Sequence, residues 1–252
     1  MWLEREKERH HNRTSSRANA TQFVSGPEWP QAWSDGMTQR EHALWETPWP
    51  CAESLRALAE LNEQCLELLT KQVLQHAAPA APLLRELGDL WSRLDAPARR
   101  RAAACPYLLL DPGFTDLYRW RWVAGSQVED REPAFPSFFS VPGVTGLAHQ
   151  VFSNAWYMVR TQPLGVPLFL GMSAPCGAVF RACSLRQITD LAERHAAWLK
   201  PRWAGRPRIW SELLRAAISG EGLALEKARM RGINLLAAEL KLLEQPHGLE
   251  RR

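Results

Sequence analysis

The 252-residue sequence lacks the apolar segments that membrane and secreted proteins require. A membrane-spanning helix needs about 20 consecutive apolar residues, and no run in this chain approaches that length. The N-terminal stretch MWLEREKERHHNR is charged and has no apolar centre of the kind found in signal peptides. These absences predict a cytoplasmic protein that does not enter a membrane.

Cysteine is scarce, and its spacing fits neither a disulfide framework nor a zinc site. No C-x-x-C pair occurs among the cysteines at positions 51, 65, 105, 176 and 183. Most of them fall within helical patterns, which is typical of buried thiols. We therefore expect reduced, mostly structural cysteines and no bound metal.

The chain also lacks the motifs of catalytic sites. It contains no glycine-rich phosphate loop, no cluster of metal-ligand residues and no nucleophile motif. His195 lies on the apolar side of a predicted helix, while Glu193, two residues away, lies on another side, so hydrogen-bond reach is not expected. We predict an interior or interface histidine, no cofactor and no enzymatic activity.

What the sequence does contain is helical periodicity. The clearest segment is CSLRQITDLAERHAAWLKPRW, where Ser184 and Gln187 have the spacing of a capping box and Pro201 ends the pattern. Apolar residues recur between them at three- and four-residue steps. Similar patterns predict helices over residues 51–75, 83–94, 95–105, 147–160, 174–183, 209–219 and around 230–240. The fold class expected is all-α, a bundle of short helices.

Composition divides the chain into a leader, two helical modules, a connector and a tail. The leader is polar and without a sustained period, which is typical of disorder. Because Met37 precedes the first periodic segment, translation from Met1 or from Met37 is compatible with the sequence. The connector is rich in proline and aromatic residues, and within it Tyr118–Trp122 (YRWRW) fits a strand, although an aromatic linker docked on the core is the favoured interpretation. The expected segments are 1–36, 37–110, 111–146, 147–243 and 244–252.

The two modules show weak internal sequence similarity, which we call the sequence echo. Residues 94–114 align without a gap with residues 183–203 at an offset of 89, each stretch having a cap residue, a helix and a Leu-x-Pro-x-aromatic motif. Farther upstream the offset slips. We therefore predict two degenerate copies of one helical module. The matching residues are Leu110 and Leu199, Pro112 and Pro201, and Phe114 and Trp203.

Four short motifs follow one another in the second half of the chain, and their order and spacing are informative. They are Leu170-Gly171, Ser184-Leu185-x-Gln187, Leu191-Ala192-Glu193 and Gly232-Ile233-x-Leu235. In this arrangement, residues 147–243 resemble the D subunit of the bacterial flagellar transcriptional activator.

The resemblance implies an all-α, dimer-forming subunit that binds promoter DNA together with a second, zinc-containing subunit. This chain differs because it is about twice as long and has no four-cysteine zinc set. If the repeat holds, two halves of one chain could form a dimer-like pair, so self-association could be replaced by an internal pseudo-dimer. Partners expected are therefore DNA and a second regulatory subunit, with no membrane.

A basic region provides the candidate DNA contacts. Between residues 194 and 231 there are nine Lys or Arg and three Glu, so the local excess is six positive charges, which favours phosphate or acidic partners. Within KPRWAGRPR the candidates are Lys200, Arg202, Arg206 and Arg208, although a proline-braced structural turn is the alternative. Candidate interface residues are Trp198, Trp203 and Trp210, since tryptophan suits both cores and interfaces. The function expected is transcriptional regulation, and the alternative is a helical protein–protein adaptor without DNA binding.

Overall fold

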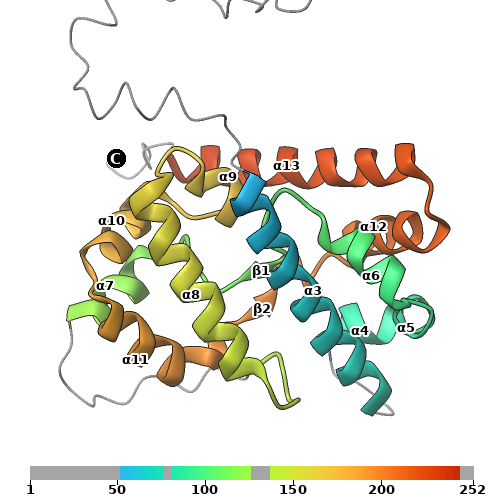
Figure 1. The fold of residues 1–252 in the computed structure, drawn as a ribbon, viewed down its shortest axis with the longest axis horizontal. Coiled ribbons are helices and arrows are strands. Elements are labelled where there is room, and N and C mark those ends of the chain that lie inside the picture. The colour runs from blue at the N-terminus through green and yellow to red at the C-terminus, as the bar shows by residue number, and fades with distance from the viewer. Residues whose placement is uncertain (1–51, 76–80, 126–136, 245–252) are drawn as a thin grey trace, which may run out of the picture. The chain divides into compact units, whose positions relative to one another are not determined.

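The computed structural model describes residues 52–75, 81–125 and 137–244, with the side chains of 122–125 and 244 excluded. The expected all-α fold is confirmed, because helices dominate these residues (Figure 1). The predicted leader, Cys51 and the tail beyond 244 lie outside them. The first half contains α3 (Ala52–Gln75), α4 (Pro82–Glu86), α5 (Gly88–Ser92), α6 (Ala96–Ala103), β1 (Leu110–Asp111) and α7 (Leu117–Gly125). The second half contains α8 (Val144–Thr161), α9 (Val166–Leu170), α10 (Ala174–Ala182), α11 (Leu185–His195), η2 (Ala196–Trp198), β2 (Lys200–Pro201), α12 (Pro207–Ser219) and α13 (Gly222–Glu244).

Local capping signals place two of the helix starts. The Ser184 hydroxyl accepts the Gln187 N–H, and the Gln187 side chain accepts the Ser184 N–H at 2.8 Å, so the predicted capping box is present. The Asp95 carboxylate likewise accepts the Ala98 N–H at 2.8 Å and begins α6. The α-helix after Ser184 ends at His195, earlier than predicted, because the chain tightens into η2 before entering β2.

The strand alternative for YRWRW is wrong, whereas the favoured interpretation, docking of its aromatic residues on the core, is confirmed at Trp120. These residues lie in α7, which Asp116 begins by accepting the Arg119 N–H at 3.1 Å. Trp120 is fully buried and donates its indole N–H to the Gly113 carbonyl at 2.8 Å, while Tyr118 is exposed. Positions 118 and 120 would share one face of a strand but lie on different sides of a helix, so an exposed Tyr118 and a buried Trp120 fit the helix.

The two halves use the same packing scheme. In the first half the long helix α3 packs on α6, and in the second the long helix α8 packs on α11. The two long helices also contact each other, as Figure 1 shows. The helix that follows each strand crosses over: α7 packs on α10 of the second half, and α12 packs on α4, α5 and α6 of the first. Each half therefore completes the other.

The strand register agrees with the sequence echo. β1 and β2 are antiparallel, with Leu110 opposite Pro201 and Asp111 opposite Lys200. At the offset of 89, Asp111 and Lys200 are equivalent positions. Two equivalent residues face each other only where an approximate two-fold axis passes between the halves, so the register places such an axis at this pair.

Aromatic contacts follow nearly the same correspondence, with Trp120 and Trp210 of the crossing helices 90 residues apart. Trp91 and Phe180 are 89 residues apart, and each packs against the tryptophan of the crossing helix: Trp91 on Trp210 with ring centroids 5.7 Å apart, and Phe180 on Trp120 at 4.7 Å. The two tryptophans donate their indole N–H groups to the carbonyls of Arg202 and Gly113, which are also 89 apart. These correspondences fit the predicted repeat.

One hydrophobic cluster connects the halves, from Leu58 on α3 to Leu236 on α13. Helix α13 packs against α12 and α9. Cys65, Cys105, Cys176 and Cys183 are free and buried, and burial raises their pKa values, so these four thiols are structural as expected. Across the described helices, none is long and apolar enough to cross a membrane.

Candidate interaction surfaces

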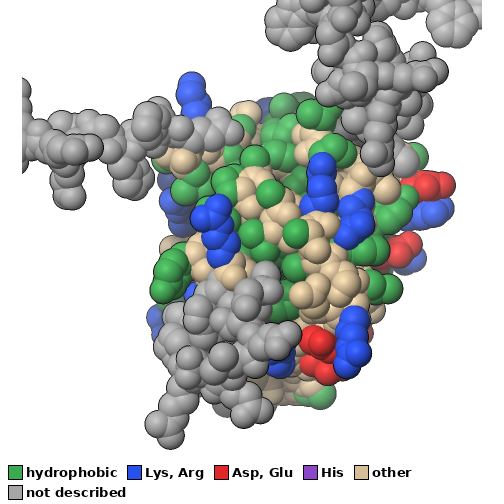
Figure 2. All heavy atoms as spheres, turned by 90° about the vertical axis from the view of Figure 1, so that its left-hand side faces the viewer, with side chains coloured by type: hydrophobic (Ala, Val, Ile, Leu, Met, Phe, Trp, Pro, Cys, Tyr) green, Lys and Arg blue, Asp and Glu red, His purple; other side chains and the backbone are tan. Residues whose placement is uncertain are grey.

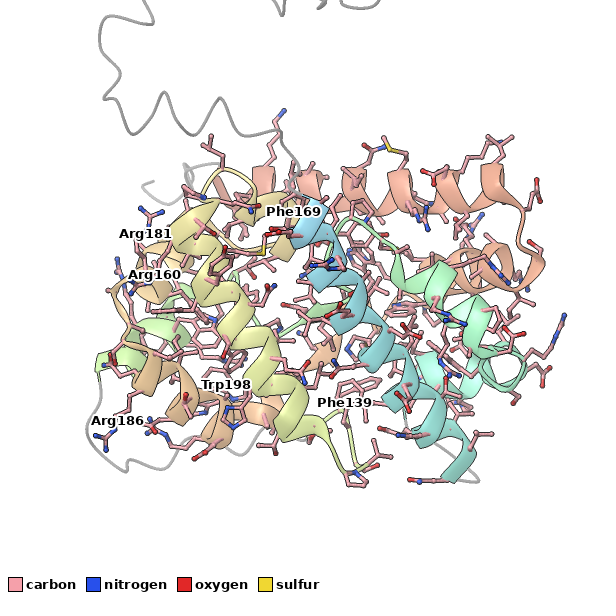
Figure 3. All side chains as sticks on the ribbon, viewed as in Figure 1. Phe139, Arg160, Phe169, Arg181, Arg186 and Trp198 are labelled. Carbon is pink, nitrogen blue, oxygen red and sulfur yellow. The ribbon has the colours of Figure 1, made fainter. Side chains whose placement is uncertain are left out.

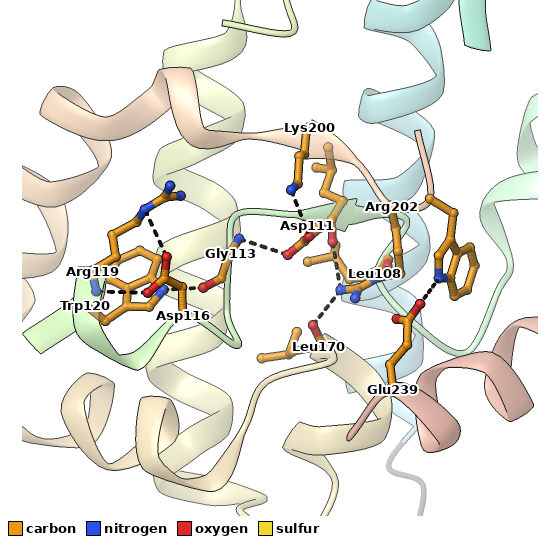
Figure 4. Close-up of polar contacts among 12 residues, drawn as sticks. Leu108, Asp111, Gly113, Asp116, Arg119, Trp120, Leu170, Lys200, Arg202 and Glu239 are labelled. Atoms are coloured by element: carbon orange, nitrogen blue, oxygen red, sulfur yellow. Dashed lines mark hydrogen bonds and ion pairs between the residues drawn. The ribbon is translucent and has the colours of Figure 1, made fainter. Parts of the chain in front are cut away.

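Arg202 is not a DNA contact. Only 5% of this residue is exposed, and its guanidinium donates hydrogen bonds to the carbonyls of Leu108 at 3.0 Å, Leu110 at 2.9 Å and Leu170 at 2.7 Å (Figure 4). The side chain therefore ties β1 and the end of α9 to β2. We correct the sequence prediction at this position, because a guanidinium enclosed by backbone carbonyls presents no face to a phosphate.

The charge of Arg202 is compensated inside the protein. Burial lowers the pKa of its guanidinium, while the nearby Asp111, Glu239 and Tyr107 raise it. The group stays protonated because an arginine pKa begins far above neutral pH. Gly171, with φ of +62°, passes so close that a Cβ there would lie 2.5 Å from Nη1 of Arg202. The structure therefore needs both residues at this junction.

The other three candidate DNA contacts are exposed, and each lies beside a carboxylate. The pairs are Lys200 Nζ with Asp111 Oδ2, Arg206 Nη1 with Glu239 Oε1 and Arg208 Nε with Glu212 Oε1, all at 3.5 Å. Exposed pairs of this kind are weak and leave the cations accessible. However, the neighbouring carboxylates reduce the positive potential that a phosphate backbone would meet.

The candidate interface tryptophans are mainly core residues. Trp198 and Trp210 are buried in the core, so these two candidates present no exposed side chain to a partner. Trp198 stacks on His195 with ring centroids 4.2 Å apart. Trp203 is half-buried, has φ of +55° and donates its indole N–H to Glu239 at 3.0 Å. It therefore fixes the turn after β2 to α13.

His195 is an interior residue, as the sequence predicted. It is buried against Trp198. Burial, with smaller contributions from Arg194 and Arg119, lowers its pKa from 6.5 to about 4. The imidazole is therefore neutral at physiological pH and does not supply charge to a surface site.

Lowering the pH from about 6.5 to about 4 is expected to reduce stability through His195. Within this window the unfolded chain binds a proton at His195 and the folded chain does not, because the folded pKa is the lower one. The stability present above pH 6.5 is then lost as pH falls, by up to about 1.4 kcal/mol per pH unit. Urea denaturation of the wild type and of His195→Gln at pH 7, 6, 5 and 4 gives the free energy of unfolding of each protein, and the slopes of this free energy against pH are compared. Equal slopes would contradict the assignment.

A second surface is formed by a stretch of the chain that carries arginines but no acidic residue. No Asp or Glu occurs from Pro133 to Thr189, a stretch that contains α8, α9, α10 and the first turn of α11. We call the exposed side chains of these segments the acid-free face. Figure 2 shows this side of the protein, with Lys and Arg spread among hydrophobic side chains and acidic groups near the right-hand and lower edges.

The cations of this region do not pair with carboxylates. Arg181 and Arg186 on the face, and Arg121 on the adjoining α7, are exposed, and within the described part of the chain none of the three forms an ion pair. Acidic groups of the flanking elements border the face: Asp116 at the start of α7 pairs with Arg119, Glu193 on α11 lies 3.8 Å from His149 on α8, and Asp190 lies one turn after Arg186 on α11. Within the described residues 137–189, the side chains of Lys, Arg, Asp and Glu are limited to Arg160, Arg181 and Arg186, so these segments carry positive charge.

Two arginines fix the ends of α8 and α10 against each other. Arg160, at the end of α8, donates to the carbonyls of Arg181 and Cys183 at 2.8 and 2.9 Å and stacks over Trp156. Arg181, at the end of α10, donates to the Val159 carbonyl of α8 at 2.6 Å. Each cation satisfies carbonyls that a helix end leaves unpaired. Figure 3 shows the two arginines close together and Arg186 projecting outward.

A groove opens between α8, α9 and α10 beside this junction. It has a volume of about 340 Å³, and Arg181 is its one charged lining residue. Leu164, next to the groove, is 59% exposed. The sequence analysis missed this surface, although the long stretch without acidic residues was a visible signal. The lining residues are Val159, Pro163, Val166, Pro167, Met172, Ser173, Ala174, Gly177, Ala178 and Arg181.

Comparisons with protein-family models, with curated proteins and with solved structures give no significant match. No group of three or more His, Cys, Asp or Glu that could hold a metal occurs within the described ranges.

Proposed function

We propose that this chain is a helical adaptor that binds a partner protein through the acid-free face. The observation that carries the proposal is a combination of three features among the described residues: exposed arginines that form no ion pair, exposed apolar side chains, and segments between residues 137 and 189 that contain no carboxylate. Positive and apolar groups that alternate on a rigid surface are complementary to an acidic, partly apolar protein surface.

Promoter-DNA binding receives less support from the geometry. Of the four candidate contacts, Arg202 is buried, and Lys200, Arg206 and Arg208 each lie beside a carboxylate. Affinity for DNA depends on neutralising several phosphates at once. The resemblance to the flagellar activator subunit still favours a regulatory setting, in which such a subunit works through a second protein. An adaptor role is compatible with that setting.

Charge reversal at one arginine of the face and one of the adjoining α7 tests the proposal. We expect Arg121→Glu/Arg186→Glu to abolish co-purification of a specific partner from the native host, because both side chains are exposed and neither supports the fold through an ion pair. The matched control is Lys200→Ala/Arg206→Ala/Arg208→Ala, which removes exposed cations elsewhere and should retain the partner. Quantitative mass spectrometry of the captured proteins, with sequencing of any captured DNA, provides the measurement.

Capture of DNA that depends on Lys200, Arg206 and Arg208 would instead support transcriptional regulation. Discrete DNA sites that are captured by the wild type and by the Arg121/Arg186 variant, but lost from the triple alanine variant, would replace the adaptor proposal. Binding to one such site should then show a salt dependence that weakens in the variant, by about 0.9 in the logarithmic slope for each phosphate contact removed.

A further inference from the structure

We infer that the groove between α8, α9 and α10 binds an acidic amphipathic segment of the partner, with apolar side chains in the groove and a carboxylate on Arg181. The inference rests on the proposed function and specifies how the partner is recognised. It corresponds to the helix-in-groove mode, in which residues at helical spacing anchor a short segment.

The groove is suited to apolar anchors. Its volume of about 340 Å³ is at the lower end for binding pockets, which is enough for a few side chains of a segment. Met172 is unbranched and adapts to different shapes. Gly177 has no side chain to occupy the groove, and the atom nearest to where its Cβ would lie is the Met172 sulfur at 3.7 Å.

Arg181 is positioned to bind a carboxylate. One of its five N–H donors reaches the Val159 carbonyl, and the residue is otherwise exposed at the edge of the groove. That hydrogen bond holds the guanidinium in place, so less conformational entropy is lost when a partner binds. A planar guanidinium matches a carboxylate with two parallel hydrogen bonds.

The charge pattern favours an acidic protein segment over nucleic acid. No carboxylate lines the groove, so an acidic ligand meets no repulsion there. A single-stranded nucleic acid would need a row of cations and aromatic rings for base stacking. The groove has one cation and no aromatic lining residue. Its occupant is therefore expected to bring mainly apolar contacts and a small number of acidic groups.

Peptide binding to the full chain tests the inference. The probe is a fluorescein-labelled 18-residue synthetic helix with leucine at i, i+3, i+4 and i+7 and glutamate on the other face. Its matched control has lysine in place of glutamate. By fluorescence anisotropy, we expect the acidic peptide to bind at least tenfold more tightly than the basic one.

Three variants locate the binding site. Ala178→Trp fills the groove without altering Arg181 and should abolish binding, while Arg181→Gln should weaken it about tenfold. Arg208→Gln removes an exposed arginine of α12, outside both the acid-free face and the groove lining, and should change affinity less than twofold. Thermal denaturation of each variant establishes that α8 and α10 remain folded.

Other results would overturn the inference. Equal binding of the two peptides, full binding to Ala178→Trp, or displacement of the acidic peptide by a mixed-sequence single-stranded oligonucleotide would each exclude an acidic segment in this groove. If the peptide does not bind but partner capture still depends on Arg121 and Arg186, the groove inference fails and the proposed adaptor function stands. If the peptide does not bind and partner capture does not depend on Arg121 and Arg186, both the groove inference and the proposed adaptor function are overturned.

Discussion

Replacing Arg202 with methionine is expected to lower the free energy of unfolding by about 3–5 kcal/mol, because hydrogen bonds to a charged group contribute about 1.5–3 kcal/mol each. The substitution keeps an unbranched side chain but leaves the carbonyls of Leu108, Leu110 and Leu170 without this donor. Buried acceptors that lose their partner carry a desolvation cost. Urea denaturation followed by circular dichroism measures the change.

Two further variants sharpen this prediction. Arg202→Lys keeps the charge but not the planar fork, so it should recover only part of the stability. Arg206→Met alters an exposed arginine a short distance along the chain and should change stability by less than about 0.5 kcal/mol. If Arg202→Met unfolded like the wild type, the buried position would be wrong, and Arg202 would return to the candidate DNA contacts.

Replacing Gly232 with alanine is expected to be the second most disruptive change. In an ordinary helix this substitution stabilises by about 0.8–1 kcal/mol. In the middle of α13, however, the new Cβ would overlap the hydroxyl and ring of Tyr107. Tyr107 is itself buried and packs edge-on against Trp203 with ring centroids 5.8 Å apart, so it has little space to move. We expect a loss of about 2–4 kcal/mol, as overpacking and backbone shifts typically cause.

A double-mutant cycle identifies the cause. Tyr107→Leu shortens the side chain that meets position 232, so Gly232→Ala should cost less in that background than in the wild type. Gly222→Ala is the matched control, because it lies in the same helix and a Cβ there has nothing within 4 Å. It should be neutral or slightly stabilising. Equal costs of Gly232→Ala in both backgrounds would exclude the contact with Tyr107 as the source.

Helix starts could be predicted from the sequence because their signals are local. Ser184 and Gln187 are three residues apart, and so are Asp95 and Ala98, so each cap is contained within one turn. The echo at an offset of 89 was also visible. Its physical meaning depended on the register between β1 and β2, which no local pattern encodes.

The role of Arg202 could not be predicted, because its partners are distant in the chain. The carbonyls of Leu108 and Leu110 are 94 and 92 residues away, and that of Leu170 is 32 away. Without those contacts, the general tendency of arginine to be exposed favours a surface position. Lys200, by contrast, has the exposure that the sequence suggested.

Composition could not assign the tryptophans, since the indole ring suits both interiors and interfaces. Trp198 and Trp210 are core residues because helices from both halves meet around them, and Trp210 packs on Trp91 from the other half. The acid-free face could have been predicted from the sequence, because no Asp or Glu occurs from Pro133 to Thr189.

The pair formed by Asp111 and Lys200 shows that the two halves of the chain are no longer equivalent. In a symmetric dimer, the residue on the axis faces its own copy, so like charges would meet; here opposite charges meet, 3.5 Å apart. The halves have diverged elsewhere too: α3 carries four glutamates, whereas α8 carries no acidic residue. A symmetric dimer would display each binding face twice, but this chain displays the acid-free face once. Under the proposed adaptor function, the expected stoichiometry is therefore one partner molecule bound at this face of each chain.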